Sequence, residues 1–246
     1  MSFDGQRVVI IGASAGIGEA AAKAFGARAA AVTITGRSRQ RLDLTAQRIG
    51  CPVQVAEVDA TSRGALDSFF AATGAVDHLV LTASPGAVGV GPIATLDEAA
   101  LRQAFDGKFF AHVNALQAAL PHLRPDGSVT IVTAASARAA FAGTAGIAAA
   151  NGALETMVAP LAVELAPLRV NAVSPGVIDT HWWNAMPGDQ RRAYFDSVAA
   201  VSPVHRVGKP DDVADAIVYL ASAGFVTGTV LECAGGFNLT AAALAS

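Results

Sequence analysis

Three glycines near the amino terminus stand at a spacing that suits phosphate binding. Gly12, Gly16 and Gly18 lie in the segment GASAGIG, directly after the apolar run VVII and before an alanine-rich stretch. Glycines in such a turn let the backbone approach a pyrophosphate, whose charge is met by free N–H groups and by the positive end of the following helix. The position of the triplet between a strand and a helix makes a dinucleotide site the preferred interpretation.

The end of the second β-branched run is the next informative position. There the run VTIT leads into Gly36-Arg37-Ser38-Arg39, with no carboxylate to hold the ribose hydroxyls of NAD. Arginine presents planar donors that match phosphate oxygens, so Arg37 and Arg39 are expected to bind a 2′-phosphate. The sequence therefore predicts NADP(H) in preference to NAD(H). The alternative is a solvated basic turn without a ligand.

Short apolar runs alternate with longer helical stretches from Arg7 onward. Beyond the first two runs, strands are expected at Val53–Val58, His78–Thr82, Val129–Thr133, Val170–Val173 and Val230–Cys233, with helices at Arg63–Thr73, Leu96–Leu120 and Asp211–Ala221. Apolar strands that do not alternate with polar residues are typical of a parallel sheet covered on both faces. The predicted fold class is α/β, a Rossmann-like doubly wound parallel β-sheet with helices on both faces, in a single domain over residues 1–246.

One segment, at about 179–210, breaks this rhythm. It holds Trp182, Trp183 and Tyr194 together with several charges, and it is longer than an ordinary connection. Long insertions in compact domains often cover a site, so we expect a substrate lid here. A surface excursion with a short helix is the alternative.

The composition limits the classes of partner. Apolar residues make up 52% of the chain and charged residues 15%, whereas an average soluble domain carries about 25% charged residues. Subunit contacts would hide part of that apolar surface, so a homo-oligomer, dimer or tetramer, is expected, although an alanine-rich composition explains some of the excess. The net charge of -3 argues against nucleic acid as a partner.

Other segments argue against a membrane or metal protein. No run of roughly 18 uncharged apolar residues is found, which argues against a membrane partner. The two cysteines are far apart, the five histidines are scattered without metal-binding spacing, and the opening segment does not have the pattern of a signal peptide. We therefore expect no metal and a cytoplasmic location.

Several motifs in order resemble the short-chain dehydrogenase/reductase family, and the resemblance covers nearly the whole chain. GASAGIG is similar to the family's glycine turn, the segment Leu161–Thr180 to its run through a Pro-Gly motif, and RVGKPDDVADAIVYLAS to its late helix. The resemblance implies an oxidoreductase that uses a nicotinamide cofactor and a small-molecule substrate. With the glycine turn, it implies a cofactor site formed by Gly12, Ser14, Ala15, Gly16, Ile17, Gly18, Arg37, Ser38, Asp59, Ala60, Ala83, Pro175, Gly176, Ile178 and Thr180.

The residues that carry out the family's chemistry are missing. The family uses Ser and Tyr as hydroxyl donors, with Lys and Asn in support. The resemblance places the Ser position at Ala134, the Tyr position at Ile147, the Lys position at Asn151 and the Asn position at Lys108. A shifted register would use Ser136 or Thr133 as the hydroxyl instead.

Lysine and asparagine have thus exchanged places. If Lys108 and Asn151 face one pocket, Lys108 can bind the nicotinamide ribose or act as the acid, its pKa lowered by burial. The alternative is that Lys108 pairs with Asp106 or reaches solvent. His181 and Tyr194 are the other candidate proton donors, so the catalytic candidates are Lys108, Asn151, His181 and Tyr194.

Two functions follow from these residues. The first is an NADP(H)-dependent oxidoreductase with a non-standard proton donor, acting on a small apolar or aromatic carbonyl or alcohol, because the expected pocket wall is Ala134, Phe141, Ile147, Trp182 and Trp183. The second is a redox-inactive protein of the same fold: a cofactor-binding sensor, a non-redox cyclase or isomerase, or a partner subunit.

Overall fold

A single parallel sheet forms the centre of the molecule. The structure, a computed structural model, describes residues 2–240. Its seven strands lie in the order β3-β2-β1-β4-β5-β6-β7, and all neighbours pair in parallel. The strands are β1 Arg7–Ile11, β2 Ala31–Gly36, β3 Val53–Glu57, β4 Val76–Leu81, β5 Leu123–Val132, β6 Arg169–Pro175 and β7 Val230–Cys233. The predicted α/β fold is confirmed.

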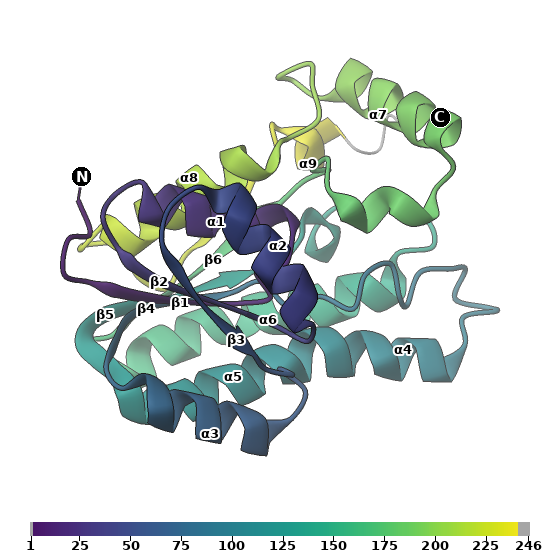
Figure 1. Cartoon of the computed structure of the whole chain (residues 1–246). Helices are drawn as coiled ribbons and strands as arrows, with labels where there is room; N and C mark the ends of the chain where they lie inside the picture. The colour runs from purple at the N-terminus through teal and green to yellow at the C-terminus, as the bar shows by residue number, and fades with distance from the viewer. Residues whose placement is uncertain (1, 241–246) are drawn as a thin grey trace.

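Helices cover both faces of this sheet, as Figure 1 shows. One apolar core joins the sheet to α1 Gly16–Gly26, α2 Arg39–Ile49 and α8 Pro210–Ser222, and a second core joins it to α3 Arg63–Thr73, α5 Ala111–Ala119 and α6 Ala145–Glu164. In the central strand β1, the run from Val8 to Ile11 is continuously apolar because side chains on both faces are buried; Val8 and Ile10 belong to the first core, Val9 and Ile11 to the second.

The strand order reverses between β1 and β4, which are direct neighbours in the sheet. Chain connections leave the two strands toward opposite faces at this switch point, so a crevice opens beyond their carboxyl ends. The glycine turn follows β1 directly. The fold therefore places the predicted phosphate-binding turn at the edge where α/β sheets bind ligands.

The helix expected over Leu96–Leu120 is present, but a wider turn interrupts it. After α4 Glu98–Ala104, residues Phe105–Phe110 form a π-helical turn before α5 begins. Gly107 in this turn allows close packing, since a Cβ there would lie 2.7 Å from the Pro85 Cβ. Single π turns inside helices are frequent at functional sites. This one carries Lys108.

The segment expected to form a lid contains two helices. A short 3-10 helix at His181–Ala185 is followed by α7 Gly188–Val201, and both project beyond the sheet beside α9 Phe237–Thr240 (Figure 1). An isolated bridge between Ile178 and Gly208 closes the base of the segment. Whether the segment opens and closes stays a prediction.

Helix α6 differs from the sequence expectation in one respect. By length and composition, it is long and apolar enough to cross a membrane, and it is the one such helix among residues 2–240. Leu154, Val158 and Ala162 of this helix are buried against the sheet in the second core. We therefore read α6 as a core helix, which passes the same test of length and composition.

Candidate active site

A large cavity lies beyond the carboxyl ends of the strands. It has a volume of about 510 Å³ and joins the glycine turn to the residues expected to do chemistry. The predicted cofactor residues on its wall are Gly12, Ser14, Ala15, Gly16, Ile17, Gly18, Arg37, Ser38, Asp59, Ala60, Ala83, Pro175, Ile178 and Thr180. Gly176 was wrongly expected there. It packs on the segment after β7, since a Cβ at Gly176 would lie 2.9 Å from the Ala234 Cα.

The glycine turn is built so that the backbone forms the floor of the cavity. Gly12 has a φ of +93°, and a Cβ there would lie 2.7 Å from the Ala83 backbone nitrogen. Gly16, with a φ of +60°, begins α1, and no side chain caps the helix from Ala15. The first N–H groups of α1 therefore remain available for an anion.

The basic residues at the end of β2 do not share one role. Arg39 forms an ion pair with Asp43 at 2.9 Å and is not part of the cavity wall, which corrects the expectation for this residue. Arg37 and Arg41 both line the cavity, and neither has an ion-pair partner within residues 2–240. Ser38 caps α2 by accepting a hydrogen bond from the Arg41 backbone N–H at 3.4 Å. The sequence reasoning missed Arg41, although this cap places it in the first turn of the helix.

These features fit a phosphorylated dinucleotide. The glycine turn has no room for a side chain at Gly12 or Gly18, and the guanidinium groups of Arg37 and Arg41 lie on the same cavity wall. Asp59 lines the wall as well, with its carboxylate accepting from the Thr61 N–H and hydroxyl. No cluster of three potential metal-ligating side chains occurs in the described part of the chain.

Apolar side chains occupy the positions expected for serine and tyrosine. Ala134 and Ile147 both line the cavity, Ala134 two residues after the end of β5 and Ile147 in the first turn of α6. The loop around Gly89 packs beside Ile147, whose Cγ2 lies 3.8 Å from the position of a Gly89 Cβ. At these two positions the cavity has no hydroxyl donor.

Thr133 does not replace the missing serine. Its hydroxyl lies within hydrogen-bond distance of Glu155 Oε1 at 2.9 Å and of the Val173 carbonyl at 3.2 Å, and both are acceptors. Its single proton is therefore held by one of these groups, and its oxygen can only accept on the cavity side.

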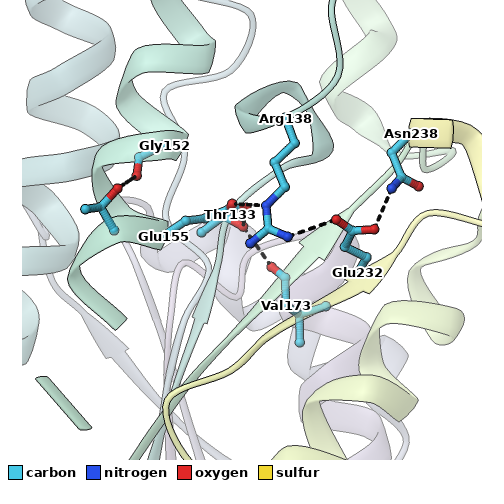
Figure 2. Close-up of polar contacts among 8 residues, drawn as sticks. Thr133, Arg138, Gly152, Glu155, Val173, Glu232 and Asn238 are labelled. Atoms are coloured by element: carbon cyan, nitrogen blue, oxygen red, sulfur yellow. Dashed lines mark hydrogen bonds and ion pairs between the residues drawn. The ribbon is translucent and has the colours of Figure 1, made fainter. Parts of the chain in front are cut away.

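Glu155 belongs to a chain of polar contacts, drawn in Figure 2. Arg138 donates to Glu155 at 2.9 Å and to Glu232 at 3.0 Å, and Asn238 donates to Glu232. The chain joins the end of β5 to α6, β7 and α9. It fixes the orientation of Thr133 from outside the cavity.

Lys108 lines the cavity together with Asn151, as expected if the two residues face one pocket. Its Nζ donates to the Val132 carbonyl oxygen at 2.8 Å, and no carboxylate pairs with it in the described residues. Burial lowers the pKa of the Lys108 ammonium to about 8, because removal from water disfavours the charged form. A group with such a pKa can give up a proton near neutral pH.

Asn151 shares the wall with Lys108 and carries an unused acceptor. Its amide nitrogen donates to the Ile147 carbonyl at 2.9 Å and to the Ser136 hydroxyl at 3.2 Å. These contacts fix the amide orientation, so the buried Oδ1 is the atom left without a partner among the residues described. Ser136 itself is not on the cavity wall, so the shifted register does not bring its hydroxyl into the site.

The two remaining candidates differ in position. His181 lines the cavity and is exposed. Tyr194 is not on the wall: it packs 5.1 Å from the Trp183 ring and belongs to a small apolar cluster with Phe141 and Phe237. Burial raises the pKa of the Tyr194 hydroxyl, which makes it a poorer acid. Neither Tyr194 nor Phe141 therefore lies on the cavity wall, and a proton-donor role for Tyr194 stays a prediction.

His112 lies next to this half of the site and was missed by the sequence reasoning. It is buried in α5, one turn beyond Lys108, and neither ring nitrogen has a partner in the described structure. Burial and, secondarily, the Lys108 charge hold the pKa of His112 well below its ordinary value. The histidine is therefore neutral at pH 7.

Comparisons with known proteins agree with this arrangement. A family model described as Enoyl-(Acyl carrier protein) reductase matches residues 12–238. The chain is 31% identical to the short-chain dehydrogenase/reductase ATR9 of Stachybotrys chlorohalonatus, covering 94% of this chain and 96% of the relative. It is also 31% identical to the cis-4-hydroxycyclohexanecarboxylate dehydrogenase of Sinomonas cyclohexanicum, covering 96% and 98% of the two chains. A small-chain dehydrogenase solved in complex with NADPH superposes with a TM-score of 0.83 at 30% identity, covering 96% of this chain and all of the other.

Proposed function

The chain belongs to the short-chain dehydrogenase/reductase family, and on that premise we propose that it is an NADP(H)-dependent oxidoreductase with Lys108 as a non-standard proton donor. The substrate is a small apolar or aromatic carbonyl compound or the corresponding alcohol. The observation that carries this proposal is the partly buried amine of Lys108, which lines the same cavity as the glycine turn.

The phosphate-binding half supports NADP(H) over NAD(H). Arg37 and Arg41 are unpaired within residues 2–240 and line the cavity near Ser38, at the start of α2. Planar guanidinium donors suit a 2′-phosphate, and no carboxylate stands at the end of β2 to repel it. The NADPH complex of the related dehydrogenase is consistent with this choice.

The roles of the remaining residues follow from their contacts. When bound, the reduced nicotinamide supplies a hydride to the carbonyl carbon. Lys108, oriented by the Val132 carbonyl, donates a proton to the carbonyl oxygen as negative charge develops there. The unpartnered Oδ1 of Asn151 accepts a hydrogen bond from a ribose hydroxyl, and His181 is the second candidate donor. The apolar wall at Ala134, Ile147 and Trp182 holds the substrate.

Lys108→Met tests the proton donor. We expect it to lower kcat/KM for reduction of an aromatic ketone by about 100-fold, the size of a general-acid contribution, with little change in NADPH affinity. In the unmodified protein the same rate should fall as the pH rises through about 8, because the ammonium loses its proton. Lys23→Met, at an exposed lysine of α1, is the matched control. A full rate in Lys108→Met would reject this role.

A redox-inactive binding protein is the second candidate, because Ala134 and Ile147 supply no hydroxyl. The triple variant Ala134→Ser, Ile147→Tyr, Asn151→Lys separates the two. Ketone reduction in that variant alone, with NADPH bound by both proteins, would favour the second candidate. A homo-oligomer, dimer or tetramer, and a cytoplasmic location both stay predictions.

A further inference from the structure

The lack of hydroxyl groups at Ala134 and Ile147 affects the reduction of some substrate classes and not of others. A carbonyl oxygen becomes negatively charged as its carbon accepts hydride, so it needs hydrogen-bond donors or a proton. When an iminium carbon accepts hydride, the positive charge on nitrogen disappears. This step requires neither a hydrogen-bond donor nor a proton from the protein. A site that keeps its glycine turn for the cofactor but lacks both hydroxyls is therefore better suited to the reduction of an iminium ion than to that of a carbonyl.

The aromatic wall of the cavity suits a cation. Trp182 and Trp183 both line it, with their ring centroids 4.5 Å apart in an edge-to-face arrangement. The Trp183 indole N–H donates to the Ile178 carbonyl at 2.9 Å, which fixes this ring. The faces of tryptophan attract cations more strongly than those of other aromatic residues.

Two oxygen atoms of the residues on this wall are available only as acceptors. The Asn151 Oδ1 is buried without a partner among the residues described, and Thr133 can only accept because its proton is directed to Glu155 or Val173. Acceptor oxygens stabilise a cation and do not help a carbonyl. The cavity therefore has an aromatic face and oxygen atoms for positive charge, but no hydroxyl at the two family positions.

Lys108, which lines the cavity together with Ala134 and Ile147, opposes a cation here. It faces neutral His112 from α5, and the other charged or titratable groups on the cavity wall are Asp59, Arg37, Arg41 and His181. Burial lowers the pKa of Lys108 to about 8, so the ammonium loses its charge as the pH rises through that value. Repulsion of a bound cation should weaken over the same range.

From these contacts we infer that the cavity accepts a second substrate class, small aromatic iminium ions, and reduces them without a proton donor from the protein. In this step the iminium carbon accepts a hydride from the reduced nicotinamide, and the C=N π electrons move to nitrogen. The products are a neutral tertiary amine and the oxidised nucleotide, and no proton is transferred. The inference rests on the proposed nucleotide binding, but not on Lys108 as an acid.

Binding is tested with two probes of the same shape in the presence of NADP⁺, which cannot reduce them. The probes are N-methyl-3,4-dihydroisoquinolinium and the neutral ketone 1-tetralone, titrated by calorimetry at pH 9. We expect the cation to bind at least about tenfold more tightly, and Trp182→Leu to remove this preference while Trp182→Phe largely keeps it. Equal or weaker binding of the cation by the unmodified protein would overturn the inference.

Turnover is tested with NADPH deuterated at the transferred position, and the amine is analysed by mass spectrometry. Deuterium should appear at the former iminium carbon, with a rate that rises through pH 8, opposite to ketone reduction. Lys108→Met should raise kcat/KM for the iminium ion about tenfold at pH 7, because it removes a nearby positive charge. Lys23→Met should leave this rate unchanged.

The outcomes separate the two proposals. If ketone is reduced but the iminium ion is not, the inference fails while the proposed function stands. If the iminium ion is reduced and Lys108→Met leaves ketone reduction intact, the inference stands and the proposed acid is wrong. If calorimetry detects no binding of either nucleotide, the proposed function fails and the inference fails with it.

Discussion

The two halves of the cavity are built from different parts of the chain. Around Gly12 and Gly16 the wall is backbone, and the charges beside it are the permanent ones of Arg37 and Arg41. Around Ala134 and Ile147 the wall is side chain and mostly apolar, and the charge on Lys108 depends on pH. The nucleotide half depends on the chain path, which the whole fold maintains. The reaction half depends on a few side chains, which can be exchanged without altering the fold.

The largest effect is expected from Gly12→Ala, which would disrupt nucleotide binding in the half of the cavity around Gly12 and Gly16 without altering the side chains around Ala134 and Ile147. The new Cβ would meet the Ala83 backbone nitrogen at 2.7 Å in a left-handed conformation with a φ of +93°. We expect a loss of about 3 kcal/mol of unfolding free energy and at least about a 100-fold weaker NADPH affinity. Urea denaturation and calorimetry measure the two quantities.

Gly50→Ala is the matched control for that substitution. Gly50 has a φ of +74° but nothing within 4 Å of its Cβ position, so only backbone strain of about 1 kcal/mol is expected. If the two variants lose equal stability and both bind NADPH normally, close backbone approach does not shape the nucleotide half.

A smaller effect distinguishes the three arginines at the end of β2. Arg37→Ala and Arg41→Ala should each weaken NADPH binding about tenfold, or about 1.4 kcal/mol, and leave NADH binding unchanged. Arg39→Ala should leave the NADPH-to-NADH ratio unchanged, because Arg39 is paired with Asp43. Titration of both nucleotides measures the ratio. A loss of preference in Arg39→Ala alone would restore the original sequence-based assignment.

An effect of similar size concerns His112, beside the reaction half. The pKa of His112 is lowered in the folded protein, so the unfolded chain binds more protons once the pH falls below about 6.5. This residue should therefore cost about 1.5 kcal/mol of stability between pH 6.5 and pH 5. His112→Leu should remove that loss, as urea denaturation at the two pH values would show. The same acid dependence in both proteins would contradict the burial of a neutral histidine.

Most of the fold and half of the site could be predicted from the sequence. The strand expected at Val230–Cys233 is β7 as predicted, and Val53–Val58 differs from β3 by a single residue. Apolar residues make up most of each strand, and local composition is enough to identify them. The π turn at Lys108 was not predictable, because it depends on how Gly107 packs against Pro85.

Some site residues could likewise be identified from local sequence, whereas the place of others depends on tertiary contacts. The glycine turn was identified because its spacing and its place between strand and helix are local properties. Arg39 and Tyr194 were expected in the site but lie off the cavity wall, since only the folded chain pairs Arg39 with Asp43 and packs Tyr194 beside Trp183. The exchange of lysine and asparagine came from the resemblance alone, and the structure places Lys108 and Asn151 on one cavity wall.

The sequence by itself determined the parallel α/β fold, the phosphate-binding turn and the loss of hydroxyls at Ala134 and Ile147, because residue type and short-range order carry that information. Tertiary structure decided that Lys108 is partly buried with a lowered pKa, that the Thr133 proton is directed to Glu155 or Val173, and that the Asn151 Oδ1 has no partner among the described residues. Desolvation and hydrogen bonding depend on which distant segments meet, and those segments are brought together only when the sheet is assembled.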